Sequence, residues 1–424
     1  MPPVRAFWLL LSGYTASSYG NYLNLVALGL FSFHWSQSTW VTGAVMAIRL
    51  GSGFLAGLVS GRILLRLPRR PLLVGLDLLQ AAAMVVLILA PSLVTLVAVA
   101  VILGFGNTTF VVALRSAIPE LVGADQRARA NGRVVTGRSL ASVFGFGTAA
   151  LVIDLGGYDL AFGVNAASFL VSAILQAFVT WPQRTSAQSS AEPASAREED
   201  QPEADAARTD RGSAGRWPWQ YLPALVVGMI AVRGVDALAS AGHNVALPIY
   251  ATLTAPDNPA AVSAQFFTAW AIGSVSAHQL VSRFLKRLDH RAFAAATCAM
   301  SVFFVLAFTG LPAAGLIAVA FLAGLADGVS EIGYLSTLQS RPEHQRTRVF
   351  GLSASVENSA FAGGMLLAGG LLDVLPVFPV VAGLHGVAVT GVLIFLLLSS
   401  GLFPRRHHGE LVDRARPPAR ADRG

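Results

Sequence analysis

Ionisable and amide side chains that recur inside long apolar segments are the residues of this sequence whose spacing suits chemistry. A charged group in hydrocarbon is costly unless it is paired or hydrated, so each one is a candidate functional group. Side chains three or four residues apart share one face of a helix. Four segments carry such a polar face: Tyr14, Ser17, Asn21 and Asn24 in 7–33; Asn107 and Thr108 in 93–114; Arg233, Asp236, Ser240, His243 and Asn244 in 222–250; Asp327, Glu331 and Tyr334 in 313–338.

The charges inside these segments do not balance. Away from the segment ends there are two arginines, Arg49 and Arg233, and four carboxylates, Asp236, Asp327, Glu331 and Glu357. An unpaired carboxyl group in apolar surroundings takes up a proton rather than stay charged. We interpret Asp327, Glu331 and Asp236 as proton-coupling groups, with the proton on Asp327 or Glu331 and with Asp236 balanced by Arg233. A purely structural role for the Arg233–Asp236 pair, at i and i+3, is equally compatible with the spacing.

The composition indicates an integral membrane protein. Of the 424 residues, 54% are hydrophobic and 12% are charged, and the mean hydropathy is +0.60. These values exclude a disordered chain, a coiled coil and a disulfide-rich secreted scaffold. The sequence contains no H-E-x-x-H, no Cys/His cluster and no G-x-S-x-G element, and its one lysine, Lys286, lies in no P-loop. We therefore expect no enzyme activity, no metal site and no cofactor, and the scattered arginines predict no nucleic-acid partner.

Twelve apolar segments are long enough to cross the roughly 30 Å hydrocarbon core as helices. They are 7–33, 40–61, 72–90, 93–114, 134–153, 160–181, 222–250, 262–285, 292–310, 313–338, 350–372 and 377–403. Arginines gather in the connections after even-numbered segments, whereas the connections after odd-numbered segments contain no Lys or Arg. Because basic loops stay in the cytoplasm, we predict that both termini are cytoplasmic and that the chain lies in a bacterial plasma membrane.

The sequence contains an internal repeat at an offset of about 220 residues. Residues 61–70 align with 282–291, and 126–132 align with 345–351, in equivalent connections of each half. Residues between the halves are polar and cannot bury apolar surface. We predict an all-α membrane protein of two pseudo-symmetric six-helix bundles, with the boundaries 1–181 for the first bundle, 182–218 for a disordered cytoplasmic linker, 219–403 for the second bundle and 404–424 for a cytoplasmic tail.

Two stretches, 110–135 and 158–173, resemble the macrolide-efflux and enterobactin-exporter branch of the major facilitator superfamily. The matching residues are Arg115, Ile118, Pro119, Glu120, Leu121, Val122, Ala130 and Asn131 in the first, and Ala161, Phe162, Asn165, Ala166, Ser168, Phe169 and Leu170 in the second. The chain departs from the family pattern where Gly61 replaces an Asp, where Asn21 replaces a common acidic residue, and where the antiporter motif at 145–150 lacks its proline.

The resemblance implies a twelve-helix major facilitator fold with a central cavity lined by the first, fourth, seventh and tenth helices. The polar faces lie on these helices, which makes the expected substrate-binding residues Tyr14, Asn21, Asn24, Asn107, Arg233, Asp236, His243, Asn244 and Tyr334. The resemblance also places the second helix against the eleventh, so we predict an Arg49–Glu357 pair between the halves. Another expected gating residue is Asp77, paired with the arginines at 62–70 that include Arg62. Gly57 and Gly145 belong to small-residue repeats that let helices approach closely, and the resemblance implies that these repeats form part of the contact between the halves.

These inferences favour a secondary transporter that exports a bulky amphipathic organic compound, such as an antibiotic, a siderophore or another secondary metabolite, by proton-coupled alternating access. An uptake or uniport carrier of a small organic solute and a non-transporting membrane receptor are the alternatives. The expected partners are the small-molecule substrate and the lipid bilayer, and we expect a monomer that uses the proton gradient. His278 and His385 lie singly on apolar faces and are expected to be packing residues.

Overall fold

The computed structural model describes residues 3–122, 127–179, 222–284, 289–341 and 343–402, and the regular structure of these ranges is entirely α-helical. Helix α2 begins after the N-cap Ser38, whose side chain accepts a hydrogen bond from the amide of Val41, and α9 begins in the same way after Asp289. The helices are α1 (Pro3–Ser36), α2 (Thr39–Arg66), α3 (Arg69–Leu89), α4 (Leu93–Val122), α5 (Arg127–Ala177), α7 (Ala224–Thr254), α8 (Pro259–Phe284), α9 (His290–Ala307), α10 (Ala313–Gln339), α11 (Glu343–Leu372) and α12 (Val377–Leu402).

Helix α5 consists of two helical segments joined at a sharp bend. The backbone leaves the helical region at Gly156 and Gly157, and the φ of Gly157 is 67°, a conformation that glycine adopts without a Cβ clash. The sequence predicted separate helices at 134–153 and 160–181, and the bend lies between them. The predicted linker 182–218 and tail 404–424 lie outside the described residues.

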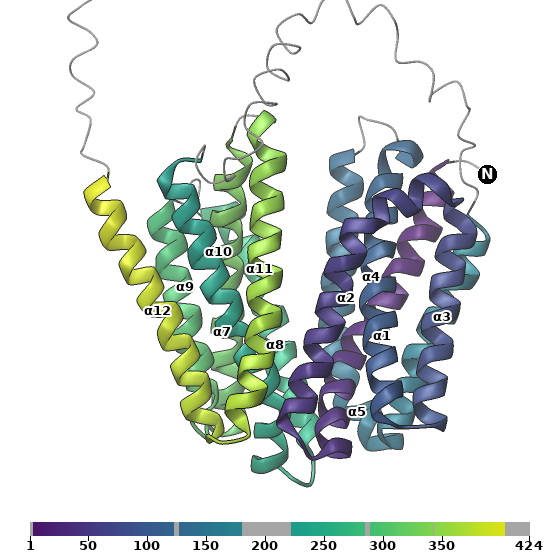
Figure 1. Ribbon diagram of the computed structural model, residues 1–424. Coiled ribbons are helices and arrows are strands. Elements are labelled where there is room, and N and C mark those ends of the chain that lie inside the picture. The colour runs from purple at the N-terminus through teal and green to yellow at the C-terminus, as the bar shows by residue number, and fades with distance from the viewer. Residues whose placement is uncertain (1–2, 123–126, 180–221, 285–288, 342, 403–424) are drawn as a thin grey trace, which may run out of the picture.

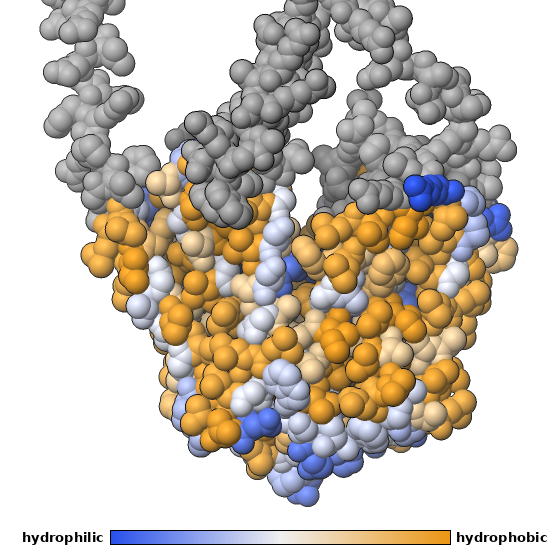
Figure 2. Space-filling model, in the orientation of Figure 1, coloured by the Kyte–Doolittle hydropathy of each residue, from blue (hydrophilic) through white to orange (hydrophobic). Residues whose placement is uncertain are grey.

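The outer surface is apolar over most of its height. Figure 2 shows hydrophobic residues covering the sides of both groups of helices, with hydrophilic residues at the lower end and at the upper right edge. In the described part of the chain, eight helices are long and apolar enough to cross a membrane: α2, α3, α4, α5, α7, α9, α10 and α12. Helices α1, α8 and α11 are not among them, and α1 and α11 carry polar residues that border the interior, such as Asn21 and Glu357. The chain is therefore an all-helical, multi-pass membrane protein.

The helices form two bundles that share a hydrophobic core at one end only. We call α1–α5 the N-terminal bundle and α7–α12 the C-terminal bundle; Figure 1 shows them together below and apart above. The largest core cluster contains residues of both bundles, such as Leu28 and Leu247. Two smaller clusters each belong to one bundle, around Phe7 and around Phe293. The shared core marks the closed end, where α2 and α8 begin, and the separate cores mark the open end, where α1 and α11 begin.

Contacts between the bundles run from α2 to α11 and from α5 to α8. The predicted packing of the second helix on the eleventh is thus confirmed. At the closed end Thr39 donates a hydrogen bond to the Gly369 carbonyl oxygen at 2.9 Å and also bonds Asp373. A Cβ on Gly43 would lie 2.6 Å from the Met365 carbonyl oxygen, so only glycine permits this approach of α2 to α11.

The small-residue repeats do not all lie between the bundles as predicted. A Cβ on Gly145 would lie 2.7 Å from the Tyr19 carbonyl oxygen on α1, and Gly57 faces Thr108 on α4 and the interior cavity. Both contacts are within the N-terminal bundle, so the prediction that these two glycines form the surface between the halves is wrong. Spacing of small residues indicates close packing but does not specify which neighbouring helix is approached.

We predict that Gly43→Val weakens the closed end. Because the new side chain would meet the backbone of α11, which cannot move like a side chain, overpacking by about 1–3 kcal/mol is expected to separate α2 from α11. The measurement is disulfide formation between Thr39→Cys and Asp373→Cys, in a chain whose single Cys298 is replaced by Ser. Cross-linking should fall in the Gly43→Val variant.

The matched control is Gly51→Val, which lies two turns along the same helix, where a Cβ has no neighbour within 4 Å among the atoms that the structure describes. Cross-linking in this variant should equal that of the parent chain. Equal cross-linking in the Gly43→Val and Gly51→Val variants would contradict the assignment of the closed-end contact.

Candidate functional site

Two adjoining cavities lie between the bundles, with volumes of about 840 Å³ and 350 Å³. The larger is bounded mainly by α1, α2, α4 and α11, and the smaller mainly by α7, α8, α9 and α11, with Asp327 from α10. They lie next to each other, because both are bordered by Tyr22, Leu25, Leu50, Asn244, Asn358 and Phe361. Figure 2 shows a hollow between the bundles at the open end, with hydrophilic residues inside it.

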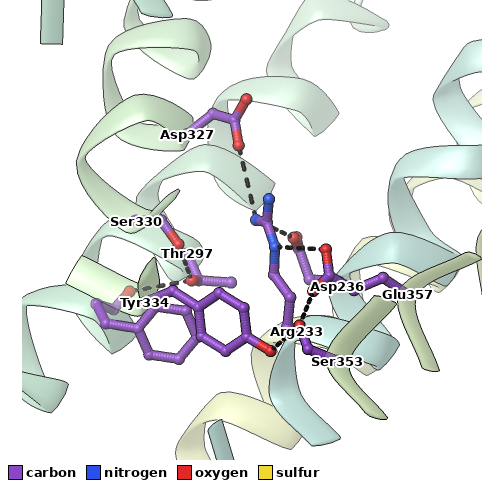
Figure 3. Close-up of polar contacts among 9 residues, drawn as sticks. Arg233, Asp236, Thr297, Asp327, Ser330, Tyr334, Ser353 and Glu357 are labelled. Carbon is purple, nitrogen blue, oxygen red and sulfur yellow. Dashed lines mark hydrogen bonds and ion pairs between the residues drawn. The ribbon is translucent and has the colours of Figure 1, made fainter. Parts of the chain in front are cut away.

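A cluster of four charged side chains lies against the smaller cavity and centres on the guanidinium of Arg233 (Figure 3). Its Nη1 lies 3.2 Å from Oδ2 of Asp236 and 3.8 Å from Oδ1 of Asp327, and its Nε lies 3.5 Å from Oε2 of Glu357. Asp236 is one helical turn along α7, whereas Asp327 belongs to α10 and Glu357 to α11. One arginine thus compensates three carboxylates contributed by three helices.

The hydroxyl groups of Ser353 and Tyr334 support the charge cluster through two linked hydrogen bonds. Ser353 donates a hydrogen bond of 2.6 Å to Oε1 of Glu357, and its hydroxyl lies 2.7 Å from that of Tyr334. The Tyr334 ring stacks on Phe293 of α9 with a centroid distance of 5.7 Å. Tyr334 is 2% exposed and is absent from the cavity lining, so the prediction that it contacts substrate directly is wrong; it orients the residues that do line the cavity.

His243 lies deeper on the same face of α7 and borders the smaller cavity. Its Nδ1 is 3.1 Å from Nε2 of His385 on α12, its Nε2 is 3.2 Å from the amide nitrogen of Asn244, and its ring stacks on Phe304 at 3.9 Å. Both imidazoles are buried. The sequence treated His385 as a solitary packing residue, but it is the hydrogen-bond partner of His243, on a helix that the sequence could not place beside α7.

The N-terminal wall of the larger cavity is polar and basic. It includes Tyr14, Asn21 and Asn107, as the polar faces predicted, together with Arg49. The Nη2 of Arg49 donates a hydrogen bond of 3.2 Å to Oδ1 of Asn21. Asn24 has no place in the cavity lining; it is fully buried, and its position three residues after Asn21 turns it about 60° away from the cavity. The predicted substrate contact of Asn24 is therefore wrong.

Sequence reasoning missed Arg138, whose Nε donates a hydrogen bond of 2.8 Å to the hydroxyl of Tyr22 at the cavity surface. The apolar segment was taken to begin at residue 134, which put Arg138 close to a membrane edge. Helix α5 begins at Arg127, so Arg138 lies three turns inside the helix. The signal that could have identified it is its place on the Arg138, Ala141, Gly145 face, which turns toward α1.

The predicted Arg49–Glu357 gating pair is not formed, and Asp77 forms no ion pair with an arginine whose side chain the structure describes. Glu357 pairs with Arg233 rather than with Arg49, because α11 turns this carboxylate toward α7 instead of across the cavity to α2. Asp77 is 1% exposed and accepts a hydrogen bond from Gln80, and no ion pair to an arginine is present among the residues described around it. It lies eight residues into α3, about 12 Å from the helix start. The side chain of Arg62 lies outside the described part.

Comparisons with known proteins agree with this arrangement. A sequence profile of the Major Facilitator Superfamily matches residues 10–365. A bacterial homologue of the human lysosomal transporter Spinster, in an inward-facing and occupied conformation, has 14% identity and a TM-score of 0.67, covering 94% of this chain and 96% of its own.

Two peptide-transporter structures also have this fold. The peptide transporter POT in complex with sulfate has 14% identity and a TM-score of 0.65, with 94% of this chain and 95% of its own covered. The POT family transporter PepTSo has 11% identity and a TM-score of 0.70, with 95% and 98% covered. At these identities the likeness is one of fold. No curated protein sequence matches the chain.

We predict that Arg233→Gln destabilises the protein by about 3 kcal/mol, at the lower end of the range for a broken buried pair because the side chain is 17% exposed. Three carboxylates would then face one another without a cation. The measurement is the thermal unfolding midpoint of the purified protein in detergent. Adding Asp236→Asn to the variant should restore part of the loss.

The matched control is Arg138→Gln, which removes an arginine that faces the same interior and forms no ion pair with a described carboxylate. Its unfolding midpoint should change little. If the Arg233→Gln and Arg138→Gln variants unfold at the same temperature, the charge cluster does not stabilise the fold as described.

Proposed function

Because this chain belongs to the major facilitator superfamily, we propose that it is a secondary transporter that exports a bulky amphipathic organic compound in exchange for protons. The observation that carries the proposal is the Arg233 cluster, which places three carboxylates around one guanidinium at the wall of a cavity between two bundles. The fold supports transport, and the unbalanced charge supports coupling to protons.

Alternating access follows from the contacts between the bundles. The closed end is held by the approach of Gly43 to α11 and by the stacked rings of Phe146 and Phe267, whose centroids are 4.9 Å apart. The bundles have separate hydrophobic cores at the open end. If the closed-end contacts separate while the open end closes, the cavity between them changes the side from which water reaches it.

The proton is carried in the carboxylate cluster, and Asp327 is the proposed carrier. Its carboxylate is the most distant of the three from the guanidinium, at 3.8 Å, and it borders the cavity. Asp236, at 3.2 Å, remains the closest counter-ion. Protonation of Asp327 from outside and release of that proton to the cytoplasm, where substrate then binds, gives one exchange cycle. Glu331, the other proposed carrier, has no ion pair among the described side chains.

Two features support export and the class of substrate. The motifs at 110–135 and 158–173 resemble exporters of macrolides and enterobactin. The cavity volumes of about 840 Å³ and 350 Å³ lie in the range of sites for drug-sized molecules, and its walls combine aromatic rings such as Trp270 and Phe361 with a few polar groups.

The distribution of arginines in the connections supports a cytoplasmic location for the open end and for both termini. We accordingly propose twelve spans in a bacterial plasma membrane, with 182–218 as a cytoplasmic linker, and a monomer that works without a cofactor. The substrate binds among the cavity-lining residues Tyr14, Asn21, Asn107, Arg233, Asp236, His243 and Asn244.

The test is accumulation of a panel of antibiotics and siderophores in cells that express the protein. At least one compound should accumulate less than in control cells, and a proton uncoupler should abolish the difference. In everted membrane vesicles, Asp327→Asn should remove uptake driven by a pH gradient while substrate exchange at equal pH is retained, because exchange needs no net proton movement.

Glu331→Gln is assayed alongside, since it removes the second candidate carrier, and Asp159→Asn serves as the control because Asp159 is exposed at the bend of α5 and outside the cavity lining. The control should transport normally. Undiminished coupling in both the Asp327→Asn and Glu331→Gln variants would rule out the proposed proton site.

A further inference from the structure

The cavity has walls of opposite charge, and the two signs belong to different bundles. Arg49 and Arg138 line it from the N-terminal bundle. From the C-terminal bundle the lining includes Asp236, Asp327 and Glu357 with the single arginine Arg233. Ionised fully, the two arginines give the first wall a charge of +2, and the three carboxylates with one arginine give the second a charge of −2.

The basic wall has hydrogen-bond donors that the described residues do not use. Arg49 bonds Asn21 through Nη2, while its Nη1 is buried without a hydrogen-bond partner in the described chain. Among the described residues, Arg138 forms its hydrogen bond with the neutral hydroxyl of Tyr22, through Nε. Neither guanidinium forms an ion pair with a described carboxylate. The carboxylate of Glu331 on α10 attracts Arg138 from beyond ion-pair distance. Two guanidinium groups that form no ion pair with a described residue at one cavity surface suit a carboxylate or phosphate group.

The acidic wall, by contrast, has fewer hydrogen-bond donors and less positive charge than its carboxylates need. Asp236 is 3% exposed and borders the smaller cavity, and its Oδ1 has no hydrogen-bond partner among the groups described there. Glu357 is the most accessible acid of the cluster, with 30% of its side chain exposed. A buried carboxylate oxygen without a donor is costly, and a protonated amine in the cavity would supply both the donor and the positive charge.

We propose that the substrate is amphoteric: an organic molecule with an anionic group that binds Arg49 and Arg138 and a basic amine that binds the Asp236–Asp327–Glu357 wall. This rests on the proposed function and narrows its substrate class. The apolar body between the two groups lies against Tyr22 and Phe361, which border both cavities.

The cavity should select against singly charged ligands, because each of them leaves the charge of one wall unpaired. A molecule with only an amine pairs with the acidic wall, but it displaces water from the two arginines and gives them no anion in return. A molecule with only an anionic group pairs with the arginines and leaves the acidic wall without a cation. Each lost charge-assisted contact is worth about tenfold in affinity. The amphoteric member of a matched series should therefore bind about tenfold more tightly than either singly charged member.

The experiment measures binding to the full-length protein in lipid nanodiscs by equilibrium dialysis, with no gradient applied, so that failure of transport does not affect the result. The probes are norfloxacin, which has a carboxylate and a basic piperazine, its ethyl ester, which is a cation only, and its N-acetyl derivative, which is an anion only. Empty nanodiscs correct for partition into lipid. Norfloxacin should bind most tightly.

Two variants test which wall binds which charged group of the probe. Arg138→Gln should weaken norfloxacin and the N-acetyl derivative about tenfold and leave the ester unchanged, whereas Glu357→Gln should weaken norfloxacin and the ester and leave the N-acetyl derivative unchanged. The Asp159→Asn variant, changed at the bend of α5, should bind all three as the parent does. Equal affinities for the three probes, tighter binding of a singly charged one, binding of none, or loss of affinity in the variants regardless of probe charge would overturn the proposal.

Discussion

The burial of one guanidinium is the constraint on which the C-terminal side of the cavity depends. Arg233 lies inside an apolar bundle, where an uncompensated charge is far more costly than in water. Carboxylates on α7, α10 and α11 compensate this charge, and their ion pairs hold the three helices together at the Arg233 guanidinium. The hydroxyls of Ser353 and Tyr334 then fix one of those carboxylates. Because three acids share one cation, the same arrangement that stabilises the bundle leaves it with excess negative charge.

The closed end is held by different forces from those in the cavity. It depends on backbone approach at Gly43 and on the stacking of Phe146 with Phe267, with one polar link through Thr39. Such contacts are short-ranged, and each bundle keeps its own core at the other end. The bundles can therefore tilt without either one having to unfold or repack internally.

The sequence predicts the parts of this arrangement that hydrocarbon thickness and helical periodicity control. Segment length locates the helices, a glycine pair ends the first part of α5, and the spacing on α7 and α10 brings Arg233 and Asp327 to the interior. Partners across helices are not predicted. The packing of the second helix on the eleventh predicted a pair of Arg49 with Glu357, but it does not say toward which neighbour each helix turns its charge. Arg138 was missed because α5 begins before its apolar run does.

The two walls of the cavity carry charges of opposite sign, and each wall belongs to a different bundle. The free energy of closing the cavity therefore depends on what the cavity contains. Across a water-filled cavity the attraction between the walls is weak, and it grows as the walls approach and water leaves. Closure over an empty cavity would desolvate Arg138 on one side and Glu357 on the other before they could pair. Protonation of Asp327 lowers the charge of the acidic wall by one and so lowers that cost. In the proposed cycle, a bound molecule whose amine occupies the same wall lowers the cost in place of the proton. Under the proposed function, the proton on Asp327 and the amine of the occupant therefore compete for one wall, and such competition is the physical requirement for exchanging one against the other.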